Sequence, residues 1–258
     1  MTGRERIAQA FAGHGRSAAL MPYLMSGFPS HEASIEAVKA AVDAGADLIE
    51  LGVPFSDPLA DGPVIQAAGT AALEAGATPM RALDVCRSVG EQLPVVLMVY
   101  ANVVAAAGPE LYAQRAAAAG AAGLIVPDLP HDEAAPVREA CDAEGLALAP
   151  LVAPTSTSGR VEEVGADARG FVYAVSLTGT TGERAELPPG LAQTVAGVRA
   201  ATELPVAVGF GISRPEQARA VSELADGVIV GSRVVRAAEE GGAEAVRDLV
   251  SELASALA

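Results

Sequence analysis

Lysine is almost absent from this sequence, whose 258 residues contain only Lys39, inside an expected helix. An aldolase that forms a Schiff base needs a lysine at its reaction centre, so covalent imine chemistry is excluded. The sequence also lacks the G-x-S-x-G motif of many hydrolases and any Cys/His arrangement typical of a thiol nucleophile. General acid and base catalysis by carboxylates, with tyrosine as a further candidate, is the chemistry that remains.

Cysteine and histidine are scarce as well. Cys86 and Cys141 are far apart and form no C-x-x-C motif, which favours a reducing compartment and gives no disulfide framework. The histidines, His14, His31 and His131, have no metal-ligand spacing, so we expect no metal site. Because no apolar run reaches the ~18 residues of a membrane span and the N-terminus lacks a long apolar core, we expect a cytoplasmic protein.

Basic residues are outnumbered, since 17 Lys and Arg against 32 Asp and Glu give a net charge of −15. A polyanion would be repelled over most of such a surface, so we expect no nucleic-acid partner. With 51% hydrophobic residues the chain can bury a large core, and barrels of roughly 250 residues form one domain. We therefore expect a single domain over residues 1–258, without a linker.

Eight short runs of Val, Ile and Leu predict buried strands, because they are apolar without alternating. They are residues 19–26, 47–54, 94–100, 123–128, 147–153, 170–176, 205–210 and 226–232. Ala-rich segments at helical spacing lie between them, among them residues 31–45, 109–120, 132–145 and 214–226. Eight alternating units predict an α/β fold, a (β/α)8 barrel with an additional N-terminal helix. The alternative is an open doubly wound sheet, but MSGFPS follows the first strand where that fold carries G-x-G-x-x-G.

Glu50 interrupts the apolar stretch DLIELGVP at the expected C-terminal end of a strand, where barrels carry their chemistry. A buried carboxylate is costly unless it is paired or solvated, and no Lys or Arg lies nearby in the sequence. The alternative is a structural Glu bonded to a distant Tyr or backbone group, and we favour a catalytic role. Asp57 and Asp61 follow in the loop FSDPLADGP, where an acid alone is more often a helix cap.

Glycine gathers in the loops after the last three strands, in SLTGTTGER, GFGIS and VGS. Exposed backbone amides, with a helix N-terminus after VGS, form a neutral anion site, and these loops hold a substrate phosphate in many barrels. The residues concerned are Gly179, Gly182, Gly209, Gly211, Gly231 and Ser232. Their convergence predicts a phosphate-binding site.

The stretch ELGVPFSDPLADGPVIQ, residues 50–66, resembles the signature of the tryptophan synthase alpha chain family. MVYAN, TGTTG, GFGIS and VGS resemble further motifs of that family, in order along nearly the whole chain. The resemblance implies a (β/α)8 barrel that cleaves indole-3-glycerol phosphate into indole and glyceraldehyde 3-phosphate. It implies an α2β2 heterotetramer with a beta chain that holds pyridoxal phosphate, the alpha chain having no cofactor of its own.

The resemblance also assigns roles to residues. Glu50 matches the general acid/base glutamate, Asp61 the second catalytic carboxylate and Tyr173 the active-site tyrosine. The loop of Asp57 is expected to face the beta chain, and Asp57 to accept a hydrogen bond from the Thr181 hydroxyl when both loops close. The implied substrate-binding residues are Tyr23, where Phe is frequent in the family, Tyr100 and Phe210. The implied phosphate-binding residues are Gly182, Gly211, Gly231 and Ser232.

Three other functions remain open. A phosphosugar isomerase or epimerase on the same barrel is opposed by the lack of a metal cluster or of a second strand-end acid opposite Glu50. A regulatory partner without strong catalysis is opposed by the presence of both Glu50 and Asp61. A stand-alone lyase that releases indole from the same substrate has the same motifs and is not distinguished by the sequence.

Overall fold

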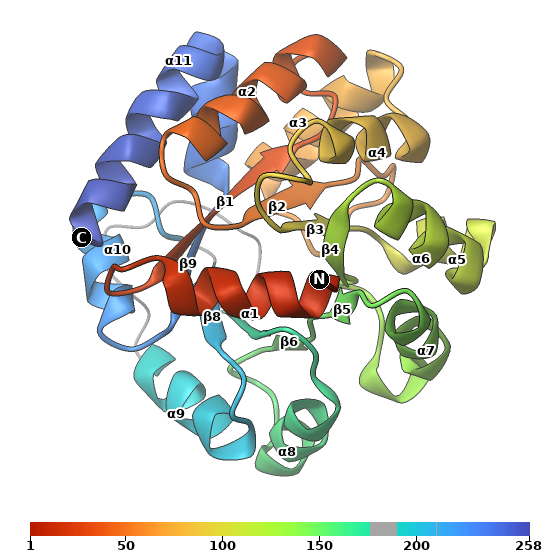
Figure 1. The fold of residues 1–258 in the computed structure, drawn as a ribbon, viewed down its shortest axis with the longest axis vertical. Helices are drawn as coiled ribbons and strands as arrows, with labels where there is room; N and C mark the ends of the chain where they lie inside the picture. Colours follow the sequence, from red (N-terminus) through yellow and green to blue (C-terminus); the bar gives the residue numbers. More distant parts are fainter. Residues whose placement is uncertain (176–189, 210) are drawn as a thin grey trace.

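The structure, a computed structural model, describes residues 1–175, 190–209 and 211–258. Its strands are β1 (Ala19–Met25), β2 (Ile49–Gly52), β3 (Val95–Met98), β4 (Ala121–Ile125), β5 (Ala147–Leu148), β6 (Leu151–Val152), β7 (Val172–Val175), β8 (Val206–Gly209) and β9 (Gly227–Val230). All pair in parallel, in the order β5-β4-β3-β2-β1-β9-β8-β7-β6. Figure 1 shows the strands as a ring with the helices around it, which confirms the predicted barrel.

The fifth predicted strand, residues 147–153, is divided into β5 and β6. Pro150 separates them, and because proline has no backbone N–H it cannot continue a hydrogen-bond ladder. The segment still closes the barrel, since the Ala149 N–H donates to the Leu124 carbonyl at 2.9 Å and the Pro150 carbonyl accepts from the Tyr173 N–H at 2.9 Å. The structure therefore has nine strand segments in its described residues where the sequence predicts eight.

One helix, α1, precedes the first strand, and the others follow the strands in chain order. They are α1 (Gly3–Gly13), α2 (His31–Asp43), α3 (Pro63–Glu74), α4 (Pro79–Arg87), α5 (Ala101–Ala107), α6 (Pro109–Ala118), η1 (His131–Glu133), α7 (Ala135–Ala143), α8 (Ser158–Asp167), α9 (Leu191–Ala201), α10 (Pro215–Ser222) and α11 (Ser232–Ala256). The four predicted helical segments contain α2, α6, α7 and α10. The units after β2 and β3 each contain a second helix, α4 and α6, which begins at a proline and so has the φ of a helical first turn already fixed.

Two apolar layers hold the barrel together. One packs the outer faces of the strands, with residues such as Leu51 and Leu97, against the surrounding helices. The other fills the barrel interior with the alternate residues of the same strands, including Met21, Tyr23 and Tyr173. Glu50 follows this alternation into the interior, between the outward residues Ile49 and Leu51.

The helix α1 closes the N-terminal end of the barrel, and in Figure 1 it lies across the ring of strands. Ile7 and Phe11 belong to the interior layer, and the Phe11 ring lies 5.5 Å from that of Phe171. The Arg6 guanidinium donates to the carbonyls of Gly120 at 3.0 Å and Leu93 at 2.7 Å. The N-terminal end of the barrel is therefore covered by α1, and we look for the site at the C-terminal ends of the strands.

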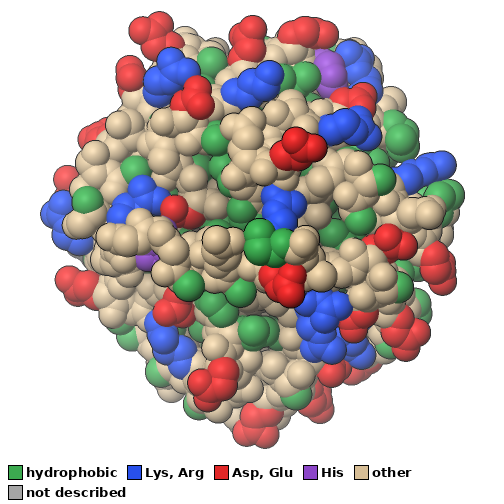
Figure 2. Space-filling view, in the orientation of Figure 1, with side chains coloured by type: hydrophobic (Ala, Val, Ile, Leu, Met, Phe, Trp, Pro, Cys, Tyr) green, Lys and Arg blue, Asp and Glu red, His purple; other side chains and the backbone are tan. Residues whose placement is uncertain are grey.

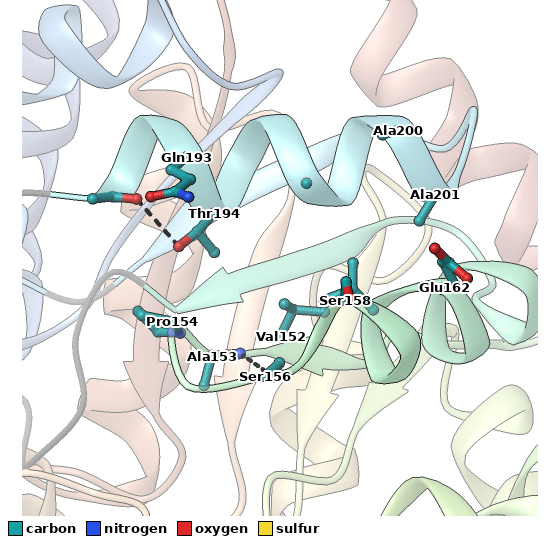
Figure 3. A pocket seen from close by; sticks show the side chains of 13 residues that line it. Val152, Ala153, Pro154, Ser156, Ser158, Glu162, Gln193, Thr194, Ala200 and Ala201 are labelled. Carbon is teal, nitrogen blue, oxygen red and sulfur yellow. Dashed lines mark hydrogen bonds between the residues drawn. The ribbon is translucent and has the colours of Figure 1, made fainter.

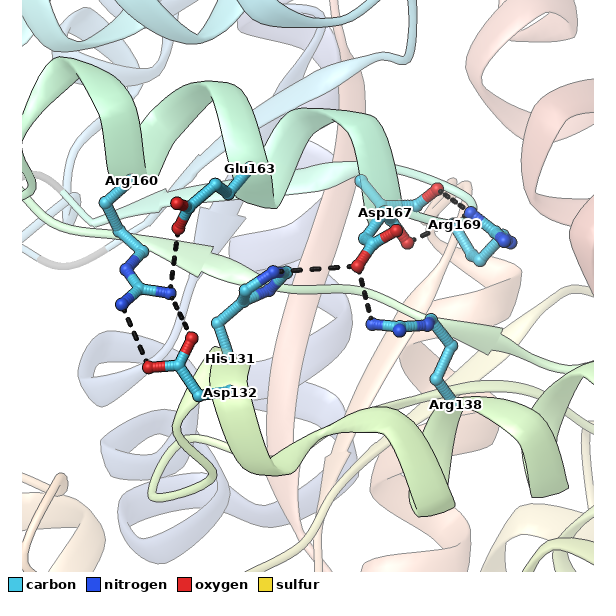
Figure 4. Close-up of polar contacts among 8 residues, drawn as sticks. His131, Asp132, Arg138, Arg160, Glu163, Asp167 and Arg169 are labelled. Atoms are coloured by element: carbon cyan, nitrogen blue, oxygen red, sulfur yellow. Dashed lines mark hydrogen bonds and ion pairs between the residues drawn. The ribbon is translucent and has the colours of Figure 1, made fainter.

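Ion pairs join η1 and α7, which precede the divided strand, to α8, which follows it (Figure 4). Arg138 pairs with Asp167 at 2.9 Å, and His131 Nε2 lies 3.6 Å from the same carboxylate. Arg160 binds Asp132 through both of its terminal nitrogens, at 2.8 and 3.0 Å. Most of these groups are partly exposed, so we assign them a structural role of modest energy.

Acidic and basic side chains are interspersed on the face that carries α1, as Figure 2 shows, and form no continuous basic surface there. Within the described ranges, no helix combines the length and the apolar character that crossing a lipid bilayer requires.

Candidate active site

Glu50 lies at the centre of the site, on β2. Its register partners are Tyr23 on β1 and Val96 on β3, and its side chain is only 1% exposed. Its Oε1 has no hydrogen-bond partner among the described residues. Burial first, and then the nearby Asp61 carboxyl, raises the pKa of Glu50 from 4.5 to about 8. Glu50 is therefore mostly protonated at neutral pH and can act as an acid.

Asp61 ends the loop that follows β2 and is 8% exposed. Its backbone is fixed, because its N–H donates to the Pro58 carbonyl at 3.0 Å and its carbonyl accepts from Gln66 Nε2 at 2.9 Å. Burial raises the pKa of Asp61 to about 6, and a hydrogen-bonding interaction with the Tyr100 hydroxyl opposes the rise. At neutral pH Asp61 is therefore mostly ionised while Glu50 is mostly protonated. Acid–base catalysis by two carboxyls requires pKa values that differ in this way.

Tyr100 follows β3 and is the residue before α5. Its hydroxyl accepts a hydrogen bond from the Ala60 N–H at 3.1 Å. Its ring stacks on Phe55, with the ring centroids 5.0 Å apart and the planes 21° apart. Tyr100 therefore contacts both the beginning and the end of the loop between β2 and Asp61.

Tyr23 and Tyr173 project into the barrel interior from β1 and β7. Burial raises the pKa of both phenols well above the usual value, and the neighbouring carboxyls of Glu50 and Asp61 add to the rise. The structure therefore places both predicted tyrosines beside the two predicted acids.

Two strand-end glycines make room for these tyrosines. A Cβ at Gly52 would overlap the Tyr23 hydroxyl, and a Cβ at Gly209 would overlap that of Tyr173. Gly209 had been grouped with the phosphate loops, whereas Gly52 had been missed. The available signal was its place two residues after Glu50, which puts it on the same face of β2.

The predicted phosphate site is described in part. Gly231 precedes Ser232, the first residue of α11, and its carbonyl accepts from the Val234 N–H at 2.8 Å. The amides of Ser232 and Arg233, which precede Val234, have no partner within α11 and are available to an anion. Gly211 lies in the loop after β8 with φ +88°, a conformation that favours glycine. Arg233 lies 4.0 Å from Glu240 on its own helix.

Some predicted residues fall elsewhere. Gly182, Thr181 and Phe210 lie outside the described residues, so the predicted contact between Thr181 and Asp57 does too. Asp57 itself is exposed and accepts a hydrogen bond from the Ser56 hydroxyl at 2.6 Å. Among the described residues, no three His, Cys, Asp or Glu side chains are placed to hold a metal ion.

A cavity of about 470 Å³ lies away from these acids, between α8 and α9 on the outer wall (Figure 3). Small residues of α9, including Gly197 and Ala201, face Val152 and Val161 across it, and Glu162 is its one charged lining residue within the described part of the chain. It contains none of the predicted site residues, and we assign it no part in the chemistry.

Comparisons with known proteins agree with this geometry. The family model described as tryptophan synthase alpha chain matches residues 10–257. The chain is 49% identical to the tryptophan synthase alpha chain of Halorhodospira halophila, covering 98% of this chain and 96% of that one, and 47% identical to that of Carboxydothermus hydrogenoformans, covering 91% and 89%.

Solved structures give the same result. A Mycobacterium tuberculosis tryptophan synthase structure superposes with a TM-score of 0.92 at 40% identity, covering 98% of both chains. Tryptophan synthase subunit alpha from Legionella pneumophila superposes with a TM-score of 0.88 at 35% identity, covering 100% of this chain and 98% of that one. The chain belongs to the tryptophan synthase alpha chain family.

Proposed function

We propose that the chain cleaves indole-3-glycerol phosphate into indole and glyceraldehyde 3-phosphate, with Glu50 and Asp61 moving or stabilising the protons. The observation that carries this proposal is the state of Glu50, a buried carboxyl whose Oε1 has no partner among the described residues and whose pKa is raised to about 8. A carboxyl so placed is suited to give and take a proton near neutral pH.

The reaction breaks the bond between indole C3 and the adjacent carbinol carbon. Glu50 first donates its proton to C3, and the ionised Asp61 stabilises the positive charge that develops at the indole N–H. The Glu50 carboxylate then takes the proton of the carbinol hydroxyl. The carbon–carbon bond breaks, its electron pair returns to the indole ring, and the hydroxyl oxygen becomes the aldehyde oxygen. Glu50 is protonated again and ready for another cycle.

The substrate's two ends require different surroundings. Tyr23 and Tyr173 offer aromatic surface to the indole ring beside the two acids. The amides at the start of α11, with the Ser232 hydroxyl and Gly211, are proposed to bind the phosphate without a cationic side chain. A Cβ at Gly231 would lie 3.8 Å from the Tyr23 Cβ, so the two regions adjoin.

The proposed partner is a tryptophan synthase beta chain in an α2β2 complex, with pyridoxal phosphate only in the beta chain. The face proposed for it carries the loop of Asp57 and an adjoining apolar groove between α4, α5 and α6, lined by Phe55, Met80 and Val103 among others. Leu59 in that loop is 89% exposed and Met80 is 50% exposed, although each is a large apolar side chain. Both cysteines are buried and unpaired, as suits the proposed cytoplasmic location.

Steady-state release of indole from indole-3-glycerol phosphate, with and without a beta chain, tests the proposal. We expect slow release by the isolated chain and faster release in the complex, because the partner can stabilise the closed state of the site. Fast release without acceleration would identify a stand-alone lyase, and no release in either case would reject the proposed reaction.

A further inference from the structure

Tyr100 is connected to the Asp61 loop at three points. Its hydroxyl accepts the Ala60 N–H at 3.1 Å, which leaves the hydroxyl proton free to be donated. The carboxyl of Asp61, the next residue, interacts with that hydroxyl. The Tyr100 ring stacks on Phe55 near the other end of the loop.

The attachment of Tyr100 itself is rigid. The residue is 3% exposed and lies two residues after the end of β3, immediately before α5. The Ala101 N–H, next along the chain, donates to the Asp128 carboxylate at 2.8 Å, so the start of α5 is bound to the loop after β4. In contrast, the loop leaves Ser56, Asp57 and Leu59 exposed. A fixed side chain therefore holds an otherwise exposed loop at the residue that carries the second acid.

We propose that Tyr100 is a positioning residue that holds the end of the loop and so aims the Asp61 carboxylate, rather than mainly a wall of the substrate pocket. This inference rests on the proposed function of Asp61. The ionisable groups that face Asp61 are Glu50 on β2, Tyr23 on β1, Tyr100 after β3 and Tyr173 on β7. All four are acids, so among the described groups the Tyr100 hydroxyl is the one whose contact lowers the pKa of Asp61.

Tyr100→Phe tests this role by removing only the hydroxyl. The chain offers a matched control in Tyr112→Phe, because Tyr112 is also buried and its hydroxyl has no hydrogen-bond partner among the described residues. We expect the acidic limb of the kcat/KM profile of the isolated Tyr100→Phe chain to move to higher pH by about half a unit or more. The control should keep the wild-type limb, and an unmoved limb in Tyr100→Phe would overturn the proposal.

A second measurement distinguishes an effect of the Tyr100 hydroxyl on Asp61 from a general loosening of the loop. Carbon-13 NMR of labelled Asp side chains, with the Asp61 signal assigned by its loss in Asp61→Asn, follows that carboxyl without any turnover. Its titration should move upward in Tyr100→Phe but not in Phe55→Leu, which loses the ring stack and keeps the hydroxyl. An equal shift in both variants would indicate loosening of the loop alone and would refute the proposal. If wild type releases no indole, the proposed function fails, whereas this titration still decides the role of Tyr100.

Discussion

Glu50→Gln should stabilise the folded chain increasingly as pH rises, while it abolishes cleavage. In the wild type, burial and then Asp61 raise the pKa of Glu50 from 4.5 to about 8. The folded state thus holds this proton more tightly than the unfolded state does. Its stability contribution is fully present below pH 4.5 and is lost as pH rises toward 8, where a charge is buried. Glutamine cannot ionise, so the variant avoids that loss.

The magnitude follows from the shift of about 3.5 pKa units, from 4.5 to about 8. At about 1.4 kcal/mol per unit, the cost reaches about 5 kcal/mol above pH 8 and stays near 1 kcal/mol at pH 5. This free-energy cost is not reduced by solvent screening, because Glu50 is only 1% exposed. The free energy of unfolding of Glu50→Gln, relative to wild type, should therefore rise by about 4 kcal/mol from pH 5 to pH 9.

Urea denaturation of both proteins at pH 5, 7 and 9, followed by circular dichroism, measures this difference. Replacing Glu74 by Gln serves as the control for the substitution itself, because the Glu74 side chain is exposed at the surface of α3. A difference between Glu50→Gln and wild type that is flat or falls with pH would refute the assignment of a buried, protonated Glu50. Undiminished cleavage by the Gln variant would refute its catalytic role.

Three further variants test the surroundings of the acids. Gly52→Ala should lower kcat/KM by roughly tenfold to a hundredfold, because its Cβ would lie 2.0 Å from the Tyr23 hydroxyl oxygen and 2.6 Å from the ring carbon that carries it; an unchanged kcat/KM would contradict the steric reason. Gly231→Val should weaken the binding of glyceraldehyde 3-phosphate, measured by calorimetry, roughly tenfold or more. If Arg233→Ala lost binding while Gly231→Val kept it, a phosphate site without a cationic side chain would be contradicted. Thr181→Val should reduce the rate stimulated by the beta chain more than the basal rate, and equal fold-stimulation would reject the loop coupling.

Much of the fold could be predicted because its signals are local. Unbroken Val, Ile and Leu runs predict buried parallel strands, and the Ala-rich segments 109–120 and 214–226 predict helices that the structure confirms as α6 and α10. The division of the fifth strand at Pro150 was not predicted. Residues 147–153 form one apolar run, and the run does not show that Pro150 cannot donate a backbone hydrogen bond to the sheet. A second helix in one unit was not predicted, because one helix was expected after each strand: of the two helices after β3, the segment 109–120 was predicted and α5 was not.

The candidate site, too, could be predicted from the sequence only in part. Glu50 could be found from one polar residue in an apolar strand, and Asp61 gained its role from the family motif, but neither pattern gives the pKa of either group. That quantity depends on burial and on the distance between residues brought together by the closed barrel. The contacts of Tyr100 with Phe55 and Ala60 likewise join strand ends and a loop far apart in the sequence.

Whether Glu50 is protonated at neutral pH is tested most directly by infrared difference spectroscopy of the folded chain across a pH titration. The carbonyl stretch of a protonated carboxyl, identified by its loss in Glu50→Gln, should persist at pH 7 and disappear with a midpoint near 8. A midpoint near 4.5, the ordinary value for a glutamic acid side chain, would show that Glu50 is ionised at neutral pH and would contradict its role as the acid that protonates indole C3.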